Sequence, residues 1–202
     1  MSRPGTFERV YAAIKQQLRD GLYRPGDRLE PAVLSEELNA SVTPVRDALH
    51  RLTGERLVEA PRHEGFRVPM LTETMLRHLY AWHRDLLLLA ILNRRAEIAQ
   101  LNVWPDVSGE TASYERRNHV FLALAQATNN PEHLIALRTL TERLEPAQRL
   151  EDALLDAVEE ETAEIVAALH RRDRKALRRS LVHYQRRRER IVPELLERLY
   201  AR

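Results

Sequence analysis

The 202-residue sequence contains no cysteine, which excludes a disulfide framework and any zinc or iron–sulfur centre held by cysteine. Glycine occurs only six times, and aromatic residues make up 5% of the chain. Runs of alternating apolar and polar residues are also scarce, whereas sandwiches and barrels need many such strands. The composition therefore predicts a mainly α fold.

Long hydrophobic runs are missing as well. The start, MSRPGTFERVY, lacks the apolar core of a secretory signal. The longest apolar run, LLLLAIL at residues 86–92, is far shorter than the roughly 18 residues that cross a bilayer. We therefore expect a cytoplasmic protein with no membrane partner. The net charge of +2 is too small to indicate a nucleic-acid partner, so such a function must rest on local pattern.

Short amphipathic helices are predicted at the start of the chain. The first, over residues 6–20, has apolar residues at four-residue steps. These are Val10, Ile14 and Leu18. The segment GLYRPGDRL at residues 21–29 then breaks the helical pattern and is predicted to be a turn. A second helix is expected over residues 31–38, followed by a short polar link.

The stretch SVTPVRDALHRL, residues 41–52, predicts a third helix. Thr43 can cap it with its hydroxyl, and Pro44 suits the first helical position because its missing N–H has no partner there. The predicted buried stripe is Val45, Ala48, Leu49 and Leu52. The predicted outward set is Val42, Thr43, Arg46, Asp47 and His50. This set lies at the N-terminal end, which a recognition helix inserts into the major groove, where Arg46 can bind guanine or a phosphate.

Two short extended segments follow the third helix. Residues 57–60 and 66–68 surround the turn PRHEG and predict a two-stranded hairpin with Arg62 and His63 at its tip. Two helices, a recognition helix and a hairpin wing make a winged helix-turn-helix. Packing alone explains any one of these elements, but the ordered set favours a domain over residues 1–70 that binds double-stranded DNA.

The segments GLYRPGDRL, LSEELNASVTPVRDALHRLTGERLVEA and EGFRV resemble the N-terminal domain of GntR-type transcription regulators. The resemblance implies that Thr43, Pro44 and Arg46 contact DNA and that Gly65 lies at the wing tip near the minor groove. Where this family usually has arginine after the serine, the chain has Val42. Valine cannot hydrogen-bond a base edge, so we expect an operator half-site that differs from the usual one.

Helical patterns fill residues 71–202, which predict a helical bundle. A long helix is expected over residues 73–100 with Thr72 as its cap, and four more are expected after a break around Pro105 and Gly109. Their predicted ranges are residues 111–128, 131–145, 147–171 and 173–200. The leucine run in the long helix covers more than one face, so it can pack inward or against a second subunit. The acidic and basic faces of the last two helices are either solvated or paired with each other.

The bundle resembles, less closely, the FCD-type ligand-sensing domain of the FadR-like branch of these regulators. The resemblance implies an effector-binding and dimerisation domain, often with a divalent metal held by an aspartate and a histidine four residues apart plus two later histidines. Here Glu115 and His119 occupy the first pair, Thr162 the third position and Tyr184 the fourth, with His183 one residue early. Only His119 matches, and threonine is a poor ligand. We expect a degenerate site, with His119 in the interior, rather than a loaded metal site.

An anionic effector, such as an organic acid, is the small molecule that this region would suit. The candidate effector-binding residues are His119, Glu115, Arg84, His183 and Tyr184. Arg84 enters this set because it lies on the long helix beside His83 and near Trp82. A role at the rim or at an interface is the alternative for these side chains.

The predicted function is an effector-responsive transcription regulator, expected to repress, that reads a pseudopalindromic operator as a homodimer. The alternative is a winged-helix module that binds protein, with the bundle as its scaffold. An enzyme is disfavoured, although Glu115 and His119 could exchange a proton. The sequence has no glycine-rich phosphate loop, no serine in a nucleophile elbow and no complete metal set.

Overall fold

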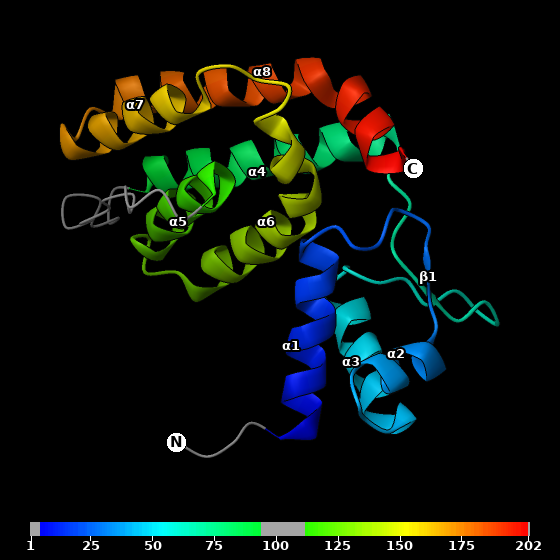
Figure 1. Ribbon diagram of the computed structural model, residues 1–202. Helices are drawn as coiled ribbons and strands as arrows, with labels where there is room; N and C mark the ends of the chain where they lie inside the picture. The colour runs from blue at the N-terminus through cyan, green and yellow to red at the C-terminus, as the bar shows by residue number, and fades with distance from the viewer. Residues whose placement is uncertain (1–4, 94–111, 202) are drawn as a thin grey trace. The chain divides into compact units, whose positions relative to one another are not determined.

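The computed structural model describes residues 5–93 and 112–201. The described chain is mostly helical with one small sheet, which confirms the predicted fold class (Figure 1). It divides into two compact units, one reaching Leu71 and including the last residues from Leu199, the other spanning Thr72–Arg198. Among the described helices, none combines the length and apolar character that a bilayer-spanning segment requires.

The first unit packs three helices around one core. They are α1 (Thr6–Arg19), α2 (Pro31–Glu37) and α3 (Val42–Gly54). The predicted apolar faces of α1 and α3 are buried and meet in this core. The core consists of Val10, Ile14, Leu18, Leu29, Leu34, Val45, Ala48, Leu49, Leu52, Leu57 and Val58. The Arg9 guanidinium donates to the Leu38 carbonyl at 2.8 Å, which ties α1 to the end of α2.

Helix α3 begins two residues earlier than a cap at Thr43 would require. Ser41 is the N-cap without a side-chain hydrogen bond, and Val42 is the first helical residue. The predicted cap at Thr43 is therefore wrong, and Pro44 occupies the third helical position. Proline is tolerated there because the first four N–H groups of a helix have no intrahelical partner.

The wing has a different pairing from the predicted hairpin. Strand β2 (Phe66–Arg67) pairs antiparallel with β1 (Arg28–Leu29), which lies in the segment predicted to be a turn. On its other side, Arg67 makes a single bridge with Glu59, with N–H···O distances of 2.8 and 2.9 Å. Two-residue strands are too short to show an alternating pattern, so the sequence could not predict the pairing with β1.

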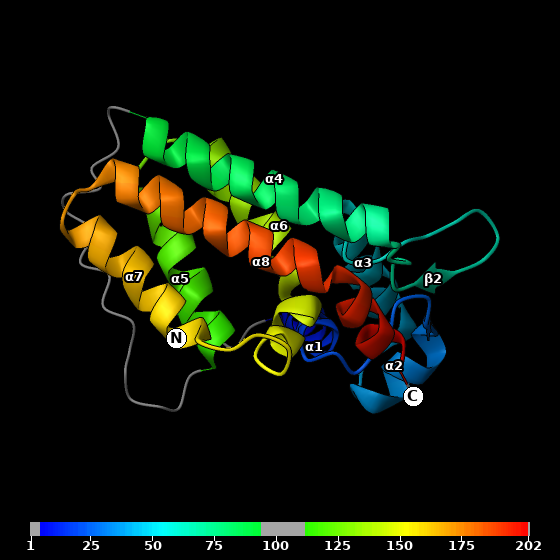
Figure 2. The same ribbon diagram turned by 90° about the horizontal axis from the view of Figure 1, so that it is seen from above.

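Five helices form the second unit over its described residues. They are α4 (Glu73–Leu92), α5 (Ser113–Gln126), α6 (Pro131–Glu151), α7 (Val158–His170) and α8 (Arg174–Tyr200). Helices α4 and α8 lie side by side and antiparallel (Figures 1 and 2), and Arg77 donates to the Glu189 carbonyl at 2.7 Å. The predicted cap Thr72 is confirmed, since its hydroxyl accepts from the Met75 amide.

Several predicted helix bounds are wrong. Helix α4 ends at Leu92 because Asn93 is extended, and the rest of its predicted range, residues 94–100, lies outside the described residues, as does the predicted break around Pro105 and Gly109. Helix α6 continues through Pro146, at the predicted boundary between two helices. A proline inside a helix costs one hydrogen bond and a clash, and the buried residues Leu144 and Ala147 on either side hold this helix in place. The expected helix over residues 147–171 is instead interrupted before α7.

Candidate functional sites

The N-terminal end of α3 presents an exposed polar face. Val42, Thr43, Arg46, Asp47 and His50 all lie on the surface, as predicted, and Pro44 is half-buried. The Arg46 side chain makes no hydrogen bond or ion pair within the described part of the chain. The positive end of the helix dipole lies at the same end. This face therefore offers a free guanidinium and a positive helix terminus, the two features that bind phosphates and base edges.

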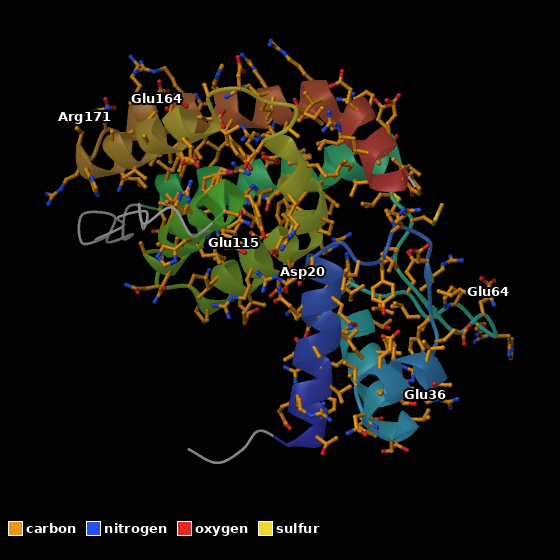
Figure 3. All side chains as sticks on the ribbon, in the orientation of Figure 1. Asp20, Glu36, Glu64, Glu115, Glu164 and Arg171 are labelled. Atoms are coloured by element: carbon orange, nitrogen blue, oxygen red, sulfur yellow. The ribbon has the colours of Figure 1, made fainter. Side chains whose placement is uncertain are left out.

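The wing loop extends this surface. The His50 ring packs edge-on against Phe66 of β2, with 4.9 Å between ring centroids, so α3 and the wing are in direct contact. Arg62, His63 and Gly65 are exposed in the loop, beside Glu64 (Figure 3). Gly65 has a φ of +77°, a left-handed conformation that favours glycine. The predicted set is thus brought onto α3 and one adjoining loop of the same unit.

A second site lies in the interior of the bundle, where all five helices contribute buried polar side chains. They are Tyr80, His83, Arg117, Asn118, Gln148, Glu151, Glu161, Thr162, Tyr184, Gln185 and Arg188. We call these residues the interior polar cluster. Charged side chains are rarely buried in protein cores unless they are paired, so their partners decide what the cluster can do.

Glu151 is the centre of the interior polar cluster. Its carboxylate accepts from the Tyr80 hydroxyl at 2.8 Å, from Arg117 Nη2 at 2.6 Å and from Arg188 Nε at 3.0 Å. Arg188 Nη1 also pairs with Glu161. Burial acts to lower the pKa of both arginines, but the Glu151 carboxylate opposes it, and their pKa values end above the ordinary value. Both arginines therefore remain charged.

Aromatic rings surround these charges. The Arg188 guanidinium lies 3.8 Å from the Tyr184 ring centroid and that of Arg117 lies 5.5 Å from it. His83 is fully buried with its ring edge-on to Phe121 at 5.3 Å. Burial, and then the positive charges of Arg117 and Arg188, lower the pKa of His83 from 6.5 to about 3. His83 is therefore neutral at physiological pH.

Part of the hydrogen-bonding capacity of the interior polar cluster is unused within the residues that the structure describes. Unpartnered atoms are both ring nitrogens of His83, Nε and Nη1 of Arg117, Nη2 of Arg188, the Tyr184 hydroxyl, Asn118 Oδ1, Gln148 Nε2 and Gln185 Oε1. Most of these atoms are donors. Buried polar atoms normally have partners, so this surplus indicates a place for an acceptor.

Most of the residues predicted to bind an effector lie outside the interior polar cluster. His119 and His183 are exposed, and Glu115 is half-buried on α5 (Figure 3). Arg84 is half-buried and pairs with Asp85 at 2.8 Å. Only Tyr184 lies in the interior polar cluster, so the interior placement of His119 was wrong.

His119 was misplaced because the buried face of α5 is a different one from the face that carries His119. Its buried residues are Tyr114, Arg117, Asn118, Val120, Phe121, Leu124 and Ala125. This stripe passes through Arg117 and Asn118 at helical spacing and leaves Glu115 and His119 on another side. The same spacing on α8 runs through Tyr184 and Arg188. Extending the apolar spacing of α5 and α8 to include charged residues would have identified Arg117 and Arg188 as interior positions.

The residues present do not fit the divalent metal implied by the resemblance. The Thr162 hydroxyl donates to the Val158 carbonyl at 3.0 Å, which uses its one proton. Across residues 5–93 and 112–201, no three histidine or acidic side chains gather as a metal-binding group. Two guanidinium groups occupy the interior instead, and a cation would be repelled by them.

Comparison with known proteins agrees with this architecture. The family described as "Bacterial regulatory proteins, gntR family" matches residues 6–68. HTH-type transcriptional regulator McbR of Escherichia coli (strain K12) is 28% identical over 139 residues, 69% of this chain and 49% of that protein. The Nta operon transcriptional regulator of Aminobacter aminovorans is 32% identical over 133 residues, 60% of this chain and 63% of that protein. The chain thus spans less than two thirds of either relative.

Solved structures share the fold along nearly the whole chain. E. coli McbR/YncC has a TM-score of 0.72 at 23% identity and covers 95% of this chain and 98% of its own. A putative transcriptional regulator GntR from Rhodococcus sp. RHA1 has a TM-score of 0.74 at 22% identity, with coverage of 93% and 97%. The matched domain, the regulators among the relatives and the shared fold lead to one conclusion. Residues 6–68 of this chain form a domain that matches the gntR family of bacterial regulatory proteins.

Proposed function

We propose that this protein is an effector-responsive transcription regulator, acting as a repressor in the cytoplasm, which reads a pseudopalindromic operator as a homodimer. The observation that carries the proposal is the exposed N-terminal face of α3, which presents an unpaired Arg46 on the helix whose His50 contacts the wing. In this role α3 enters the major groove and the wing loop contacts the adjoining backbone. Val42 can pack only against a thymine methyl, so Arg46 carries the hydrogen-bonded readout.

Arg46→Ala is expected to weaken binding to the operator by about 1–3 kcal/mol, because a bidentate base contact is lost. The measurement is a titration with DNA from upstream of the protein's own gene, at two salt concentrations, with competitor DNA present. Arg138→Ala is the matched control, since it removes the same charge from an exposed position on α6. Equal affinities of wild type and Arg46→Ala would exclude Arg46 from the readout.

The same titration distinguishes the alternative, a winged domain that binds protein. Phosphate contacts release counterions, so binding to DNA must fall steeply as salt rises. Weak binding that is indifferent to both sequence and salt would favour the protein-binding alternative. Saturable binding that survives competitor DNA would favour the regulator.

A largely exposed stripe on α4 supports the homodimer. It consists of Met75, His78, Trp82, Asp85, Leu89 and Leu92. The spacing alternates between three and four residues, which is the repeat of a helix that packs along another helix. In an antiparallel pair centred between Trp82 and Asp85, Met75 faces Leu92, and Trp82 faces Asp85 of the partner subunit. The indole N–H can then donate to that carboxylate.

Trp82→Glu is expected to convert the dimer to a monomer, because it places two carboxylates opposite each other at the centre of the stripe. Sedimentation equilibrium measures the mass directly. Leu22→Glu, at an exposed leucine of the first unit, is the control and is expected to leave the dimer intact. A dimer that survives Trp82→Glu would exclude α4 as the interface. Because the operator is read by two subunits, the monomer is also expected to bind it more weakly.

The bundle supplies the effector response in this proposal, as an FCD-type domain would. Its interior polar cluster draws side chains from all five helices, so a ligand bound there would act on how these helices pack. A ligand that favours one packing of these helices shifts the equilibrium between two dimer geometries.

A further inference from the structure

We propose that the interior polar cluster binds a small monocarboxylate directly on Arg117 and Arg188, without a divalent metal. The proposal deepens the effector response proposed above and rests on it. The two guanidinium groups supply the positive charge that binds the ligand, so no metal ion is needed for it. The carboxylate is recognised by charge-assisted hydrogen bonds.

The two arginines have unused donors after all of their internal contacts. Arg117 uses Nη2 for Glu151 and leaves Nε and Nη1 without a partner among the described residues. Arg188 uses Nε and Nη1 and leaves Nη2. Both groups are fully buried and both lie against the Tyr184 ring. Their free N–H groups thus belong to one small region of the bundle.

The charge of the cluster favours a single negative charge on the ligand. Arg187 also pairs with Glu161, so the ion-paired, largely buried side chains carry a formal charge of +1; they are Arg117, Arg187, Arg188, Glu151 and Glu161. A monocarboxylate would balance this charge and offers oxygen acceptors to several donors, whereas a dianion such as phosphate would leave one buried negative charge uncompensated. His83 is neutral and fully buried, so it adds an N–H donor without adding charge.

Tyr184 provides the most selective probe of the site. Its hydroxyl is buried without a partner among the described residues, while two guanidinium groups lie against its ring. Removing only the hydroxyl keeps these ring contacts. Tyr184→Phe therefore tests ligand binding without breaking an internal hydrogen bond of the bundle.

The first experiment is calorimetric titration of the full chain, free of DNA and with excess EDTA, using acetate, propionate and benzoate as probes. Acetamide, propionamide and benzamide are the matched neutral controls. We expect saturable binding of at least one carboxylate in EDTA, at least about tenfold tighter than its amide. Binding that appears only after Zn²⁺ or Mn²⁺ is added, equal binding of acid and amide, or no binding of any carboxylate would overturn the proposal. Inorganic phosphate binding in place of the carboxylates would overturn it as well.

The second experiment repeats the carboxylate titration with a variant that lacks only the Tyr184 hydroxyl. Tyr184→Phe is expected to bind the carboxylate about 5- to 10-fold more weakly with an unchanged melting temperature. Tyr23→Phe, in the first unit, is the control and should bind as wild type does. Unchanged carboxylate affinity in Tyr184→Phe would overturn the placement of the ligand beside Tyr184. Because neither titration contains DNA, failure here leaves operator binding testable, and failure of operator binding does not affect this result.

Discussion

Replacing Glu151 by glutamine is expected to destabilise the bundle by about 3–5 kcal/mol. The carboxylate is the shared acceptor of Tyr80, Arg117 and Arg188, and all of these side chains are buried. A neutral amide cannot balance the two guanidinium charges, and its NH₂ group would point a donor at other donors. Removing one partner of a buried ion pair is strongly destabilising because the other charge stays buried without compensation. Replacing the whole pair by apolar residues would cost much less.

Tryptophan fluorescence during urea unfolding measures this loss in the bundle alone, since both tryptophans of the chain fall between residues 72 and 198. Glu194→Gln makes the same chemical change at an exposed position on α8 and should shift the midpoint little. If Glu151→Gln unfolded at the wild-type midpoint, Glu151 would not be the common partner of the buried arginines.

The bundle is also expected to lose stability as the pH falls, through His83. In the unfolded chain this histidine takes up a proton near pH 6.5, whereas its pKa in the folded bundle is about 3. The unfolded state therefore binds one more proton between these values, and the free energy of unfolding falls by about 1.4 kcal/mol per pH unit. Above pH 6.5 the effect vanishes, and between pH 7 and pH 5 it amounts to about 2 kcal/mol.

His83→Phe isolates this contribution from that of the carboxylates. The variant keeps a ring against Phe121 and loses only nitrogens that have no partner among the described residues. We expect it to lose about 2 kcal/mol less than wild type between pH 7 and pH 5. His119→Phe, which makes the same change at an exposed position on α5, is the matched control and should follow the wild-type curve. Parallel curves for wild type and His83→Phe would show that His83 is not buried in the neutral form.

The first unit was largely predictable from local patterns. The buried stripe of α3 and its exposed set, including Arg46 and His50, follow from helical spacing alone. Two features of this unit were not predicted, the pairing of β1 with β2 and the first residue of α3. Pairing of β1 with β2 joins residues far apart in the chain, and the helix start at Val42 depends on backbone geometry that a Thr-Pro pair does not dictate.

The interior of the bundle was much less predictable. Sequence patterns assign charged residues to the surface, because a lone buried charge is prohibitively costly. Arg117 and Arg188 are exceptions that become possible only when Glu151 from a third helix reaches both of them. The spacing of each helix marks these positions as interior, but it does not say which partners will neutralise them.

The sequence by itself thus determined the helical class, the winged domain and the exposed side chains of α3, because helix periodicity and turn chemistry act over a few residues. Tertiary structure alone decided that His119 lies outside, that two arginines lie inside against Tyr184, and that the metal-ligand positions implied by the resemblance do not meet among the described residues. The physical reason is that the cost of burying a charge depends on partners supplied by other helices, and those partners are brought together only when the bundle packs.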